Sequence, residues 1–427
     1  MALWAVVILA VLVIAAVPVA AVLGILTFLL DLMVNDGRFT PAIGEFVWDK
    51  SKEFILVAVP MFILLGEIML RAGIATRMYA AVVQWLSWLP GGLMHANIGT
   101  STIFAATSGS SVATAATVGT VAYPEIERRG YSESLFLGSL AAGGTLGILI
   151  PPSINLIIYG LITDTSVPEL YLAGIFPGMI LAGLFMAVIV IACLFKRSWG
   201  GEKVQTSWPE RIRTLPDLVP PILLFLVVVG SIYAGIATPT EAASVGVVFA
   251  CCLALWTKTL NWTMLKEAFE GTMRTTAMIM LIILAAVFLN FILGFMGVTQ
   301  EILQAISHLG LTPLETMLII ILFYLILGMF METLSMMLTT VPIVFPIVAH
   351  LGYDPVWFGI MITVLMETAL ITPPIGVNLY VVHGIRKSGK FNDVAVGAAP
   401  FVIAMLVMIA MLLAAPGLAL WLPAQVY

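Results

Sequence analysis

The chain has 427 residues, of which 61% are hydrophobic and only 10% are charged. Because a soluble globular chain carries about 25% charged residues, this composition excludes a soluble protein and indicates an integral membrane protein. The apolar runs are about 20 residues long and do not alternate, so we expect helices rather than barrel strands across the lipid bilayer. No nucleic-acid partner and no organic cofactor are expected.

The first predicted elements are helices of the membrane and its interface. A helix from Leu3 to about Leu30 is too long and too poor in basic residues to be a secretory signal, so we expect it to remain as a span. A second span covers about Phe54 to Leu70. Trp85 and Trp88 then precede a Pro-Gly-Gly turn, and such aromatic residues indicate a helix in the membrane interface.

Residues 93–123 have a different composition, rich in Ala, Ser, Thr and Gly, with Thr107-Ser-Gly-Ser-Ser111 at the midpoint. Each half has only about 14 residues, too few to cross about 30 Å of hydrocarbon at 1.5 Å per residue. The segment is therefore predicted to be a re-entrant helical hairpin whose tip lies near the middle of the bilayer. Hydroxyl groups and free helix-end backbone groups at such a tip can bind an ion or an anion.

A span from about Ser134 to Ile162 contains Pro151-Pro152, and each proline removes a backbone donor that a helix needs. The helix must break at membrane depth, where freed backbone is tolerated only if protein buries it or if it lines a cavity. A further span ends at Phe195 and leads to the hydrophilic segment 196–217, which holds five Lys and Arg residues. This segment is expected to be a cytoplasmic linker.

The second half of the chain repeats this order of elements. A second re-entrant hairpin is predicted at 313–350, and a second broken span contains Pro373-Pro374. Lys258, Lys266 and Arg274 predict a basic loop ahead of this hairpin. The expected spans cover about residues 218–236, 241–256, 275–296 and 355–383, with a last one at the C-terminal end.

Matching residues recur at one spacing in the two halves. The Pro-Pro pairs are 222 positions apart (373 − 151), and after one inserted residue Asn155 and Asn378 are 223 apart (378 − 155). Such an ordered series in two apolar halves indicates two copies of one unit. The other matched pairs are Pro124 and Pro346, Gly130-Tyr131 and Gly352-Tyr353, Gly174 and Gly397, and Pro177 and Pro400.

Loop charges indicate how the two copies are oriented. In the first copy Arg128 and Arg129 follow the hairpin, and no basic residue follows the broken helix. In the second copy no basic residue follows the hairpin, and three follow the broken helix. Because Lys and Arg favour the cytoplasmic side, we predict two inverted repeats with nine full crossings. The predicted units are residues 1–195, the linker 196–217 and residues 218–427.

Paired hairpins and paired broken helices are typical of secondary transporters, with the binding site between the hairpin tips. Oxygen-rich tips and breaks suit Na⁺, and helix N-termini at the breaks suit a carboxylate. Glu332 is the most informative acid, because a carboxylate at a hairpin tip is costly in a membrane unless it is paired or reached by water. Glu67 and Glu367 carry the same argument more weakly, and Asn155 and Asn378 serve either binding or hydrogen bonds between helices. The candidate Na⁺ ligands are Ser108, Gly109, Gly144, Gly147, Thr333, Thr368, Thr372 and Gly376.

Four stretches of the chain carry a resemblance to a known family. In combination they are similar to the large membrane subunit of tripartite ATP-independent periplasmic (TRAP) transporters, the dicarboxylate-type M subunit. The resemblance covers essentially the whole chain. The stretches are Thr107 to Thr117, Tyr123-Pro-Glu with Arg129-Gly-Tyr131, Gly147 to Ser153, and Leu370 to Leu379.

The resemblance implies an elevator-type, Na⁺-driven importer in the bacterial inner membrane. It implies two partners, a small four-helix membrane subunit, expected as a separate polypeptide, and a periplasmic substrate-binding protein that delivers the solute. The typical substrates are C4-dicarboxylates, sialic acid and other organic acids. The resemblance places Ser110, Ser111 and Glu332 near the substrate path, and Asn155 and Asn378 complete the candidate substrate-binding residues.

Two alternative functions are compatible with the sequence. A stand-alone organic-anion carrier, coupled to Na⁺ or H⁺, would share the architecture and need no binding protein. An intramembrane hydrolase would use Ser108 or Ser110 as nucleophile, but no His-Glu-x-x-His motif occurs and the histidines lie near span ends or at a hairpin start. No P-loop motif occurs either, so we predict an ion-driven transporter and not an enzyme.

Overall fold

The computed structural model describes residues 12, 17–386 and 389–426, and every regular element in this part of the chain is a helix. Residues 3–11 and 13–16 of the predicted first helix lie outside the described residues, and its later part belongs to α2 (Val19–Asn35). Seven described helices are long and apolar enough to cross a membrane, or eight if the bent pair α9 (Glu133–Leu149) and α10 (Ile154–Thr163) is one span. These findings confirm an all-α, multi-pass membrane protein. The predicted count of nine crossings includes the helix from Leu3, so that count stays a prediction.

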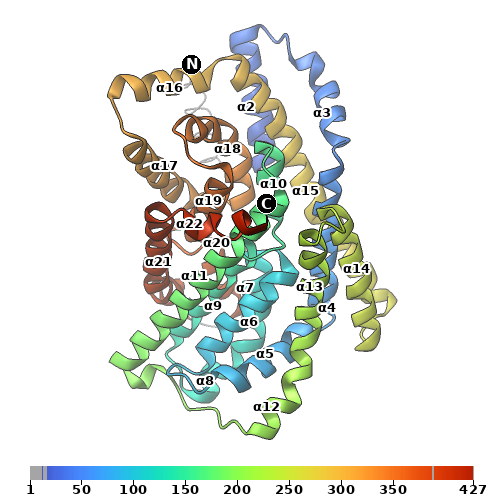
Figure 1. The fold of residues 1–427 in the computed structure, drawn as a ribbon, viewed down its shortest axis with the longest axis vertical. Coiled ribbons are helices and arrows are strands. Elements are labelled where there is room, and N and C mark those ends of the chain that lie inside the picture. Colours follow the sequence, from blue (N-terminus) through green and yellow to red (C-terminus); the bar gives the residue numbers. More distant parts are fainter. Residues whose placement is uncertain (1–11, 13–16, 387–388, 427) are drawn as a thin grey trace.

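One group of helices, which we call the flanking bundle, lies along the right side of the molecule in Figure 1. It consists of α2, α4 (Ala58–Arg71), α13 (Val219–Tyr233), α14 (Pro239–Trp256) and α15 (Trp262–Phe295). Helix α4 packs against both α14 and α15, while α2 packs on α15 and α13 on α14. Exposed apolar side chains on the outside of this group fit helices that face lipid.

Helix α15 begins earlier than the sequence predicts. The prediction of a basic loop that includes Lys266 and Arg274, followed by a span from residue 275, is wrong, because the helix already begins at Trp262. The reason is a helix cap, since Asn261 Oδ1 accepts a hydrogen bond from the Met264 N–H at 2.9 Å. Lys266 and Arg274 therefore lie on the first turns of a long helix rather than in a loop.

Two pairs of antiparallel helices occupy the segments predicted to be hairpins. The first pair is α6 (Leu93–Ser108) and α7 (Ser111–Ala122), which are joined by two residues. The second pair is α17 (Pro313–Gly328) and α18 (Thr333–His350), joined by residues 329–332. Figure 1 shows the first pair in the lower half of the molecule and the second in the upper half.

Both Pro-Pro pairs interrupt a helix. The bend between α9 and α10 is 43°, and the second pair separates α19 (Pro355–Leu370) from α20 (Val377–Ile385). After the first break, Ser153 Oγ accepts a hydrogen bond from the Leu156 N–H at 3.4 Å and caps α10. After the second, Gly376 precedes α20 with a φ of 52°, a conformation that favours glycine. Residues 150–153 at the first break are buried, so protein and not lipid covers the freed backbone there, whereas Pro373, Pro374 and Ile375 at the second break are exposed.

Two shorter amphipathic helices lie at opposite ends of the molecule. Helix α5 (Ile74–Leu86) lies near the bottom of Figure 1, and α16 (Val298–Leu309) lies near the top. Helix α5 includes Trp85, whose ring makes an edge-to-face contact with Trp208 at 6.5 Å between centroids. The other α-helices of the described residues are α3 Ile43–Ser51, α8 Pro124–Arg129, α11 Val167–Phe195, α12 Trp208–Thr214, α21 Phe391–Ala414, α22 Gly417–Leu420 and α23 Pro423–Val426.

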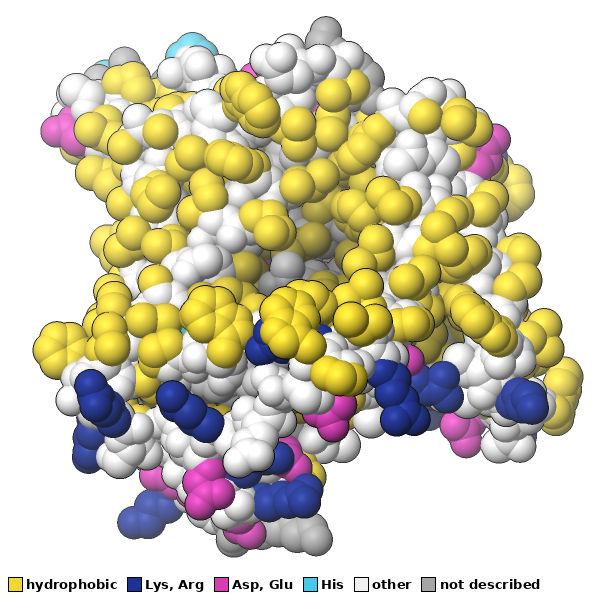
Figure 2. Space-filling view, turned by 60° about the horizontal axis from the view of Figure 1, so that its bottom comes forward, with side chains coloured by type: hydrophobic (Ala, Val, Ile, Leu, Met, Phe, Trp, Pro, Cys, Tyr) yellow, Lys and Arg dark blue, Asp and Glu magenta, His cyan; other side chains and the backbone are white. Residues whose placement is uncertain are grey.

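Basic side chains gather at one end of the molecule. Figure 2 shows Lys and Arg along the lower part of the surface, beneath a broad apolar band. Arg129 and Arg128 pair with Glu125, and mainly the hydrogen bond from Arg129 holds the pKa of that carboxyl below its usual range. The buried Arg386 pairs with Glu133 at 2.7 Å. By the positive-inside rule this end is expected to face the cytoplasm, and this orientation stays a prediction.

Helices α9 and α21 cross closely at two glycines, Gly138 and Gly397. A Cβ atom on Gly397 would lie 1.8 Å from the Ser134 carbonyl oxygen, so the crossing has no room for a side chain. We therefore expect Gly397→Ala to lower the free energy of unfolding by about 1–3 kcal/mol, a typical cost of overpacking. Thermal unfolding of the purified protein measures this change.

The matched control for Gly397→Ala is Gly183→Ala. Gly183 lies within α11 on an exposed face, and a Cβ there would meet no atom within 4 Å. Since alanine is the better helix former, this control should change stability by less than about 1 kcal/mol. If both variants unfolded at the same temperature, the crossing would not depend on the missing side chain.

Candidate functional site

The tip of the first hairpin is closed by its own hydroxyl groups. Gly109 ends α6 with a φ of 57°, and Ser110 caps α7 by accepting a hydrogen bond from the Ala113 N–H at 3.4 Å. The hydroxyls of Ser108 and Thr114 lie 2.7 Å apart, and Thr114 Oγ1 donates to the Ser110 carbonyl at 2.8 Å. The tip is therefore a fixed cluster of hydroxyl and carbonyl oxygens. Thr114 is part of it although the sequence did not single it out.

This tip lies against the first broken helix. A Cβ on Gly147 of α9 would be 2.6 Å from the Ser110 carbonyl oxygen, and a Cβ on Gly109 would be 3.2 Å from the Pro152 carbonyl oxygen. Only the absence of side chains at these two glycines allows the backbones to approach so closely. The structure thus brings together three of the predicted site residues, Gly109, Ser110 and Gly147.

Ser111 joins the first hairpin to the second broken helix. Its Oγ donates a hydrogen bond to Glu367 Oε2 at 2.5 Å, across 256 positions of the chain. Glu367 lies on the last turn of α19, just before Pro373-Pro374, and is only 1% exposed. Its other oxygen, Oε1, is buried and has no hydrogen-bond partner among the described residues. The carboxylate is therefore half-satisfied in the middle of the protein.

Asn378 lies on the other side of the same break and reaches the same region. Its Nδ2 donates to the Ala141 carbonyl at 3.3 Å, while its buried Oδ1 has no partner among the described residues. A Cβ on Gly144 would lie 3.0 Å from both Asn378 Nδ2 and the Ser111 carbonyl oxygen. Ser111, Gly144, Glu367 and Asn378 therefore form one buried cluster that contains two unpaired oxygen acceptors.

The tip of the second hairpin is organised around Glu332. Its Oε2 caps α18 by accepting from the Ser335 N–H at 3.1 Å, and its Oε1 accepts from the Thr333 hydroxyl at 3.0 Å. Glu332 is half-buried and close enough to Glu367 for a Coulombic interaction. Among the described residues neither carboxylate has an ion-pair partner, so two acids face the centre without a basic side chain paired to them.

The remaining candidate residues make local contacts. The hydroxyl of Thr368 donates to the Val364 carbonyl at 2.7 Å, and that of Thr372 donates to the Thr368 carbonyl at 2.6 Å. Gly376 has a positive φ and lies close to Thr372. A Cβ atom added to Gly376 would lie 3.1 Å from the Thr372 carbonyl oxygen. Asn155 follows the first break and is 1% exposed, and its Nδ2 has no partner in the described part of the chain.

The chemistry available at the cluster follows from its unpaired atoms. Glu367 Oε1 and Asn378 Oδ1 are acceptors without donors, and a buried acceptor without a partner costs free energy. A cation or a donor group of a bound solute would satisfy both. The sequence pointed to this region, but it ranked Glu332 above Glu367. The sequence signal that could have identified Glu367 is an acidic residue within an apolar run, just before a helix break.

Comparisons with known proteins point to one family of membrane transporters. The model described as "Tripartite ATP-independent periplasmic transporter, DctM component" matches residues 6–418. The chain is 32% identical to the "C4-dicarboxylate TRAP transporter large permease protein DctM" of Vibrio cholerae, over 96% of this chain and 94% of that protein. It is 32% identical to the "Ectoine/5-hydroxyectoine TRAP transporter large permease protein UehC" of Ruegeria pomeroyi, over 86% of this chain and 85% of that protein.

Two further similarities concern a fusion protein and a fold. The chain is 31% identical to the "Isethionate TRAP transporter permease protein DctMQ" of Oleidesulfovibrio alaskensis, over 91% of this chain and 61% of that protein. A crystal structure of the YdaH transporter of Alcanivorax borkumensis superposes with a TM-score of 0.60 at 15% identity, covering 95% of this chain and 97% of that chain. At this identity the second similarity concerns the fold alone.

Proposed function

Because the chain belongs to the DctM family of tripartite ATP-independent periplasmic transporters, we propose that it imports an organic acid together with Na⁺ across the bacterial inner membrane. It is a large permease subunit, in a family of transporters rather than enzymes. The observation that carries the proposal is the buried link between Ser111 and Glu367, which joins the first hairpin to the second broken helix. A site made from both halves of the chain suits a solute that must cross between them.

Sodium coupling is supported by the kind of atoms at the site. Na⁺ is bound by several oxygens and needs little formal charge nearby, and the two tips and two breaks supply hydroxyl, carbonyl, amide and carboxylate oxygens. We propose the tip residues Ser108, Gly109 and Thr333, and the break residues Gly144, Gly147, Thr368, Thr372 and Gly376, as the regions that hold the ions. The bound cations would offset the charges of Glu332 and Glu367 before an anionic solute enters.

The solute and the partners follow from the named relatives. Those relatives carry the names of transporters for C4-dicarboxylate, ectoine and isethionate, so we propose a small carboxylate-like solute. Ser110, Ser111, Asn155, Glu332 and Asn378 would contact it. This chain matches 61% of the DctMQ relative, which supports a small membrane subunit as a partner. A periplasmic binding protein would deliver the solute.

An elevator movement of two inverted repeats would carry the site across the membrane. The support is positional, because α5 and α16 lie at opposite ends of the molecule and the two hairpins lie in opposite halves (Figure 1). The flanking bundle would stay fixed in lipid, and the hairpins with the broken helices would move as one body. In this arrangement the centre of the molecule would open first to one side and then to the other.

Uptake into proteoliposomes tests the proposal. The chain and its small partner are reconstituted, and entry of radiolabelled succinate, isethionate and ectoine is measured with and without an inward Na⁺ gradient and a cognate binding protein. Uptake that requires both the gradient and the binding protein is expected. Uptake driven by the Na⁺ gradient without the binding protein would favour a stand-alone carrier, and uptake insensitive to the Na⁺ gradient would overturn Na⁺ coupling.

A further inference from the structure

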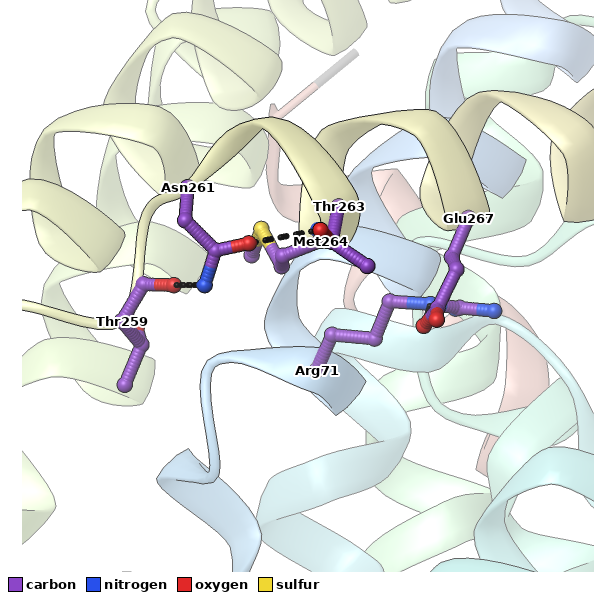
Figure 3. A pocket seen from close by; sticks show the side chains of 6 residues that line it. All are labelled: Arg71, Thr259, Asn261, Thr263, Met264 and Glu267. Atoms are coloured by element: carbon purple, nitrogen blue, oxygen red, sulfur yellow. Dashed lines mark hydrogen bonds and ion pairs between the residues drawn. The ribbon is translucent and has the colours of Figure 1, made fainter.

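An open hollow of about 540 Å³ lies on the flanking bundle, away from the hairpins. It lies between the end of α4 and the connection from α14 to α15 (Figure 3). Because α4 and α15 pack together, the hollow marks the seam between two helices of the bundle. Its lining residues are Arg71, Thr259, Asn261, Thr263, Met264 and Glu267.

The hollow contains an ion pair with both charges accessible. Arg71 Nε lies 3.5 Å from Glu267 Oε2, and Arg71 also pairs with Glu67 one turn earlier on α4. The side chain of Glu267 is 56% exposed and that of Arg71 is 26% exposed. Figure 3 shows the Arg71 and Glu267 side chains side by side at the mouth of the hollow. A ligand could match this pair if its negative group lies against Arg71 and its positive group lies against Glu267.

The rest of the lining combines the apolar Met264 with three polar side chains, of which Asn261 is held by hydrogen bonds. Asn261 caps α15 through Oδ1 and donates from Nδ2 to the Thr259 carbonyl at 3.2 Å. Glu67 is held against α15, because a Cβ on Gly271 would lie 2.8 Å from Glu67 Oε1. Thr263 lies on the first turn of α15, where the helix dipole also favours an anion.

The hollow lies at the level of the membrane interface. Trp256 and Trp262, on either side of the connection, are 76% and 80% exposed. Exposed indoles at helix ends occur where the polar ring edge meets lipid headgroups. Further along α15, Phe269 and Met273 are exposed apolar residues, which fit acyl chains. The ion pair of the hollow, the flanking indoles and the apolar face of α15 thus follow the order of headgroup, interface and hydrocarbon.

We propose that this hollow binds the phosphoethanolamine headgroup of a membrane phospholipid. The phosphate lies against the Arg71 guanidinium and the first turn of α15, and the ammonium lies against the Glu267 carboxylate. The acyl chains follow the exposed face of α15. A bound headgroup would bridge α4 and α15, so the lipid acts as a fixed part of the flanking bundle.

The ion pair discriminates among common headgroups. Ethanolamine offers three N–H donors to Glu267, whereas choline has a bulkier ammonium without a donor. A glycerol headgroup has no cation to pair with Glu267, so Arg71 alone would offset the charges of its phosphate, Glu67 and Glu267. The site therefore differs from a general basic surface, which would prefer the anionic lipid.

Lipid retention on the purified full-length chain tests this proposal. The chain is exchanged into detergent with equal amounts of phosphatidylethanolamine, phosphatidylcholine and phosphatidylglycerol, washed, and analysed by mass spectrometry. We expect phosphatidylethanolamine to be enriched about fivefold over the other two, with about one molecule per chain. Glu267→Gln should bring the three lipids close to parity, because the amide cannot pair with the ammonium as a charge.

Glu270→Gln is the matched control, since Glu270 lies one turn further on α15, is 63% exposed, and does not line the hollow. It should retain the enrichment. Soluble glycerophosphoethanolamine at equal concentration should not displace the lipid. Enrichment of phosphatidylglycerol, an unchanged pattern in Glu267→Gln, or displacement by the soluble headgroup would each overturn the proposal. Thermal unfolding of both variants shows that neither result comes from misfolding.

Discussion

Replacing Glu367 by Gln is expected to lower Na⁺-driven uptake about tenfold while the protein remains folded. The substitution preserves the size of the side chain but replaces the charge-assisted hydrogen bond from Ser111 by a weaker neutral one. It removes the charge and replaces one carboxylate oxygen by an amide donor, so the cluster loses an acceptor that a cation or solute would use. Uptake into proteoliposomes and the melting temperature of the purified variant measure the two effects separately.

Ser111→Ala removes the same link from the other side and allows a double-mutant comparison. If the Ser111 to Glu367 hydrogen bond acts as a unit, the double variant should lose little more uptake than Glu367→Gln alone. Glu169→Gln, at the partly exposed start of α11, is the matched control and should transport normally. Normal Na⁺-dependent uptake in Glu367→Gln would remove this carboxylate from the site.

The sequence predicted the helices and their interruptions well because these depend on local chemistry. Pro151-Pro152 and Pro373-Pro374 each remove backbone donors in the middle of an apolar run, so the position of each break needed no tertiary information. The start of α15 was missed by more than three turns, because Lys266 and Arg274 were counted as loop charges. A capping Asn followed by a helical charge pattern was present and would have corrected this boundary.

The assembly of the site could not be predicted in the same way. The link between Ser111 and Glu367 spans 256 positions and depends on how two hairpins and two broken helices pack. Spacing of matched residues predicts which segments correspond, but it cannot predict which atoms meet. Glu332 looked more important because it stands at a tip, yet both its oxygens are used within its own hairpin in this structure. The buried acid with an unpaired oxygen is Glu367.

Glycines allow the close backbone approaches that hold these elements together. Gly147 lies against the first hairpin tip, and Gly397 lies against Ser134. A Cβ atom added to Gly174 would lie 2.6 Å from the Leu149 carbonyl oxygen. Lipid gives helices no hydrophobic reason to associate, so close packing at small residues takes that role. A glycine between the flanking bundle and a hairpin tip is of particular interest, because in an elevator those two parts must move past each other.

Gly66 is that residue, and Gly66→Leu is expected to lower uptake about tenfold or more. It lies buried on α4, where a Cβ would be 3.1 Å from the Ser108 carbonyl oxygen at the first hairpin tip. A leucine side chain would occupy the place of the tip backbone, so the tip could not take the position seen here against the flanking bundle. Gly66→Ala should have a much smaller effect, because a shift of a few tenths of an ångström accommodates one methyl group.

Gly24→Leu on α2 is the matched control, since a Cβ there would meet no atom within 4 Å. It should transport normally and unfold at the wild-type temperature. If Gly66→Leu lost uptake while its melting temperature fell by only a few degrees, the defect would lie in the movement of the tip and not in folding. Wild-type uptake in Gly66→Leu would mean that the transport cycle does not require the tip to rest against α4, and the proposed role of the flanking bundle as the fixed partner of the first hairpin would fail.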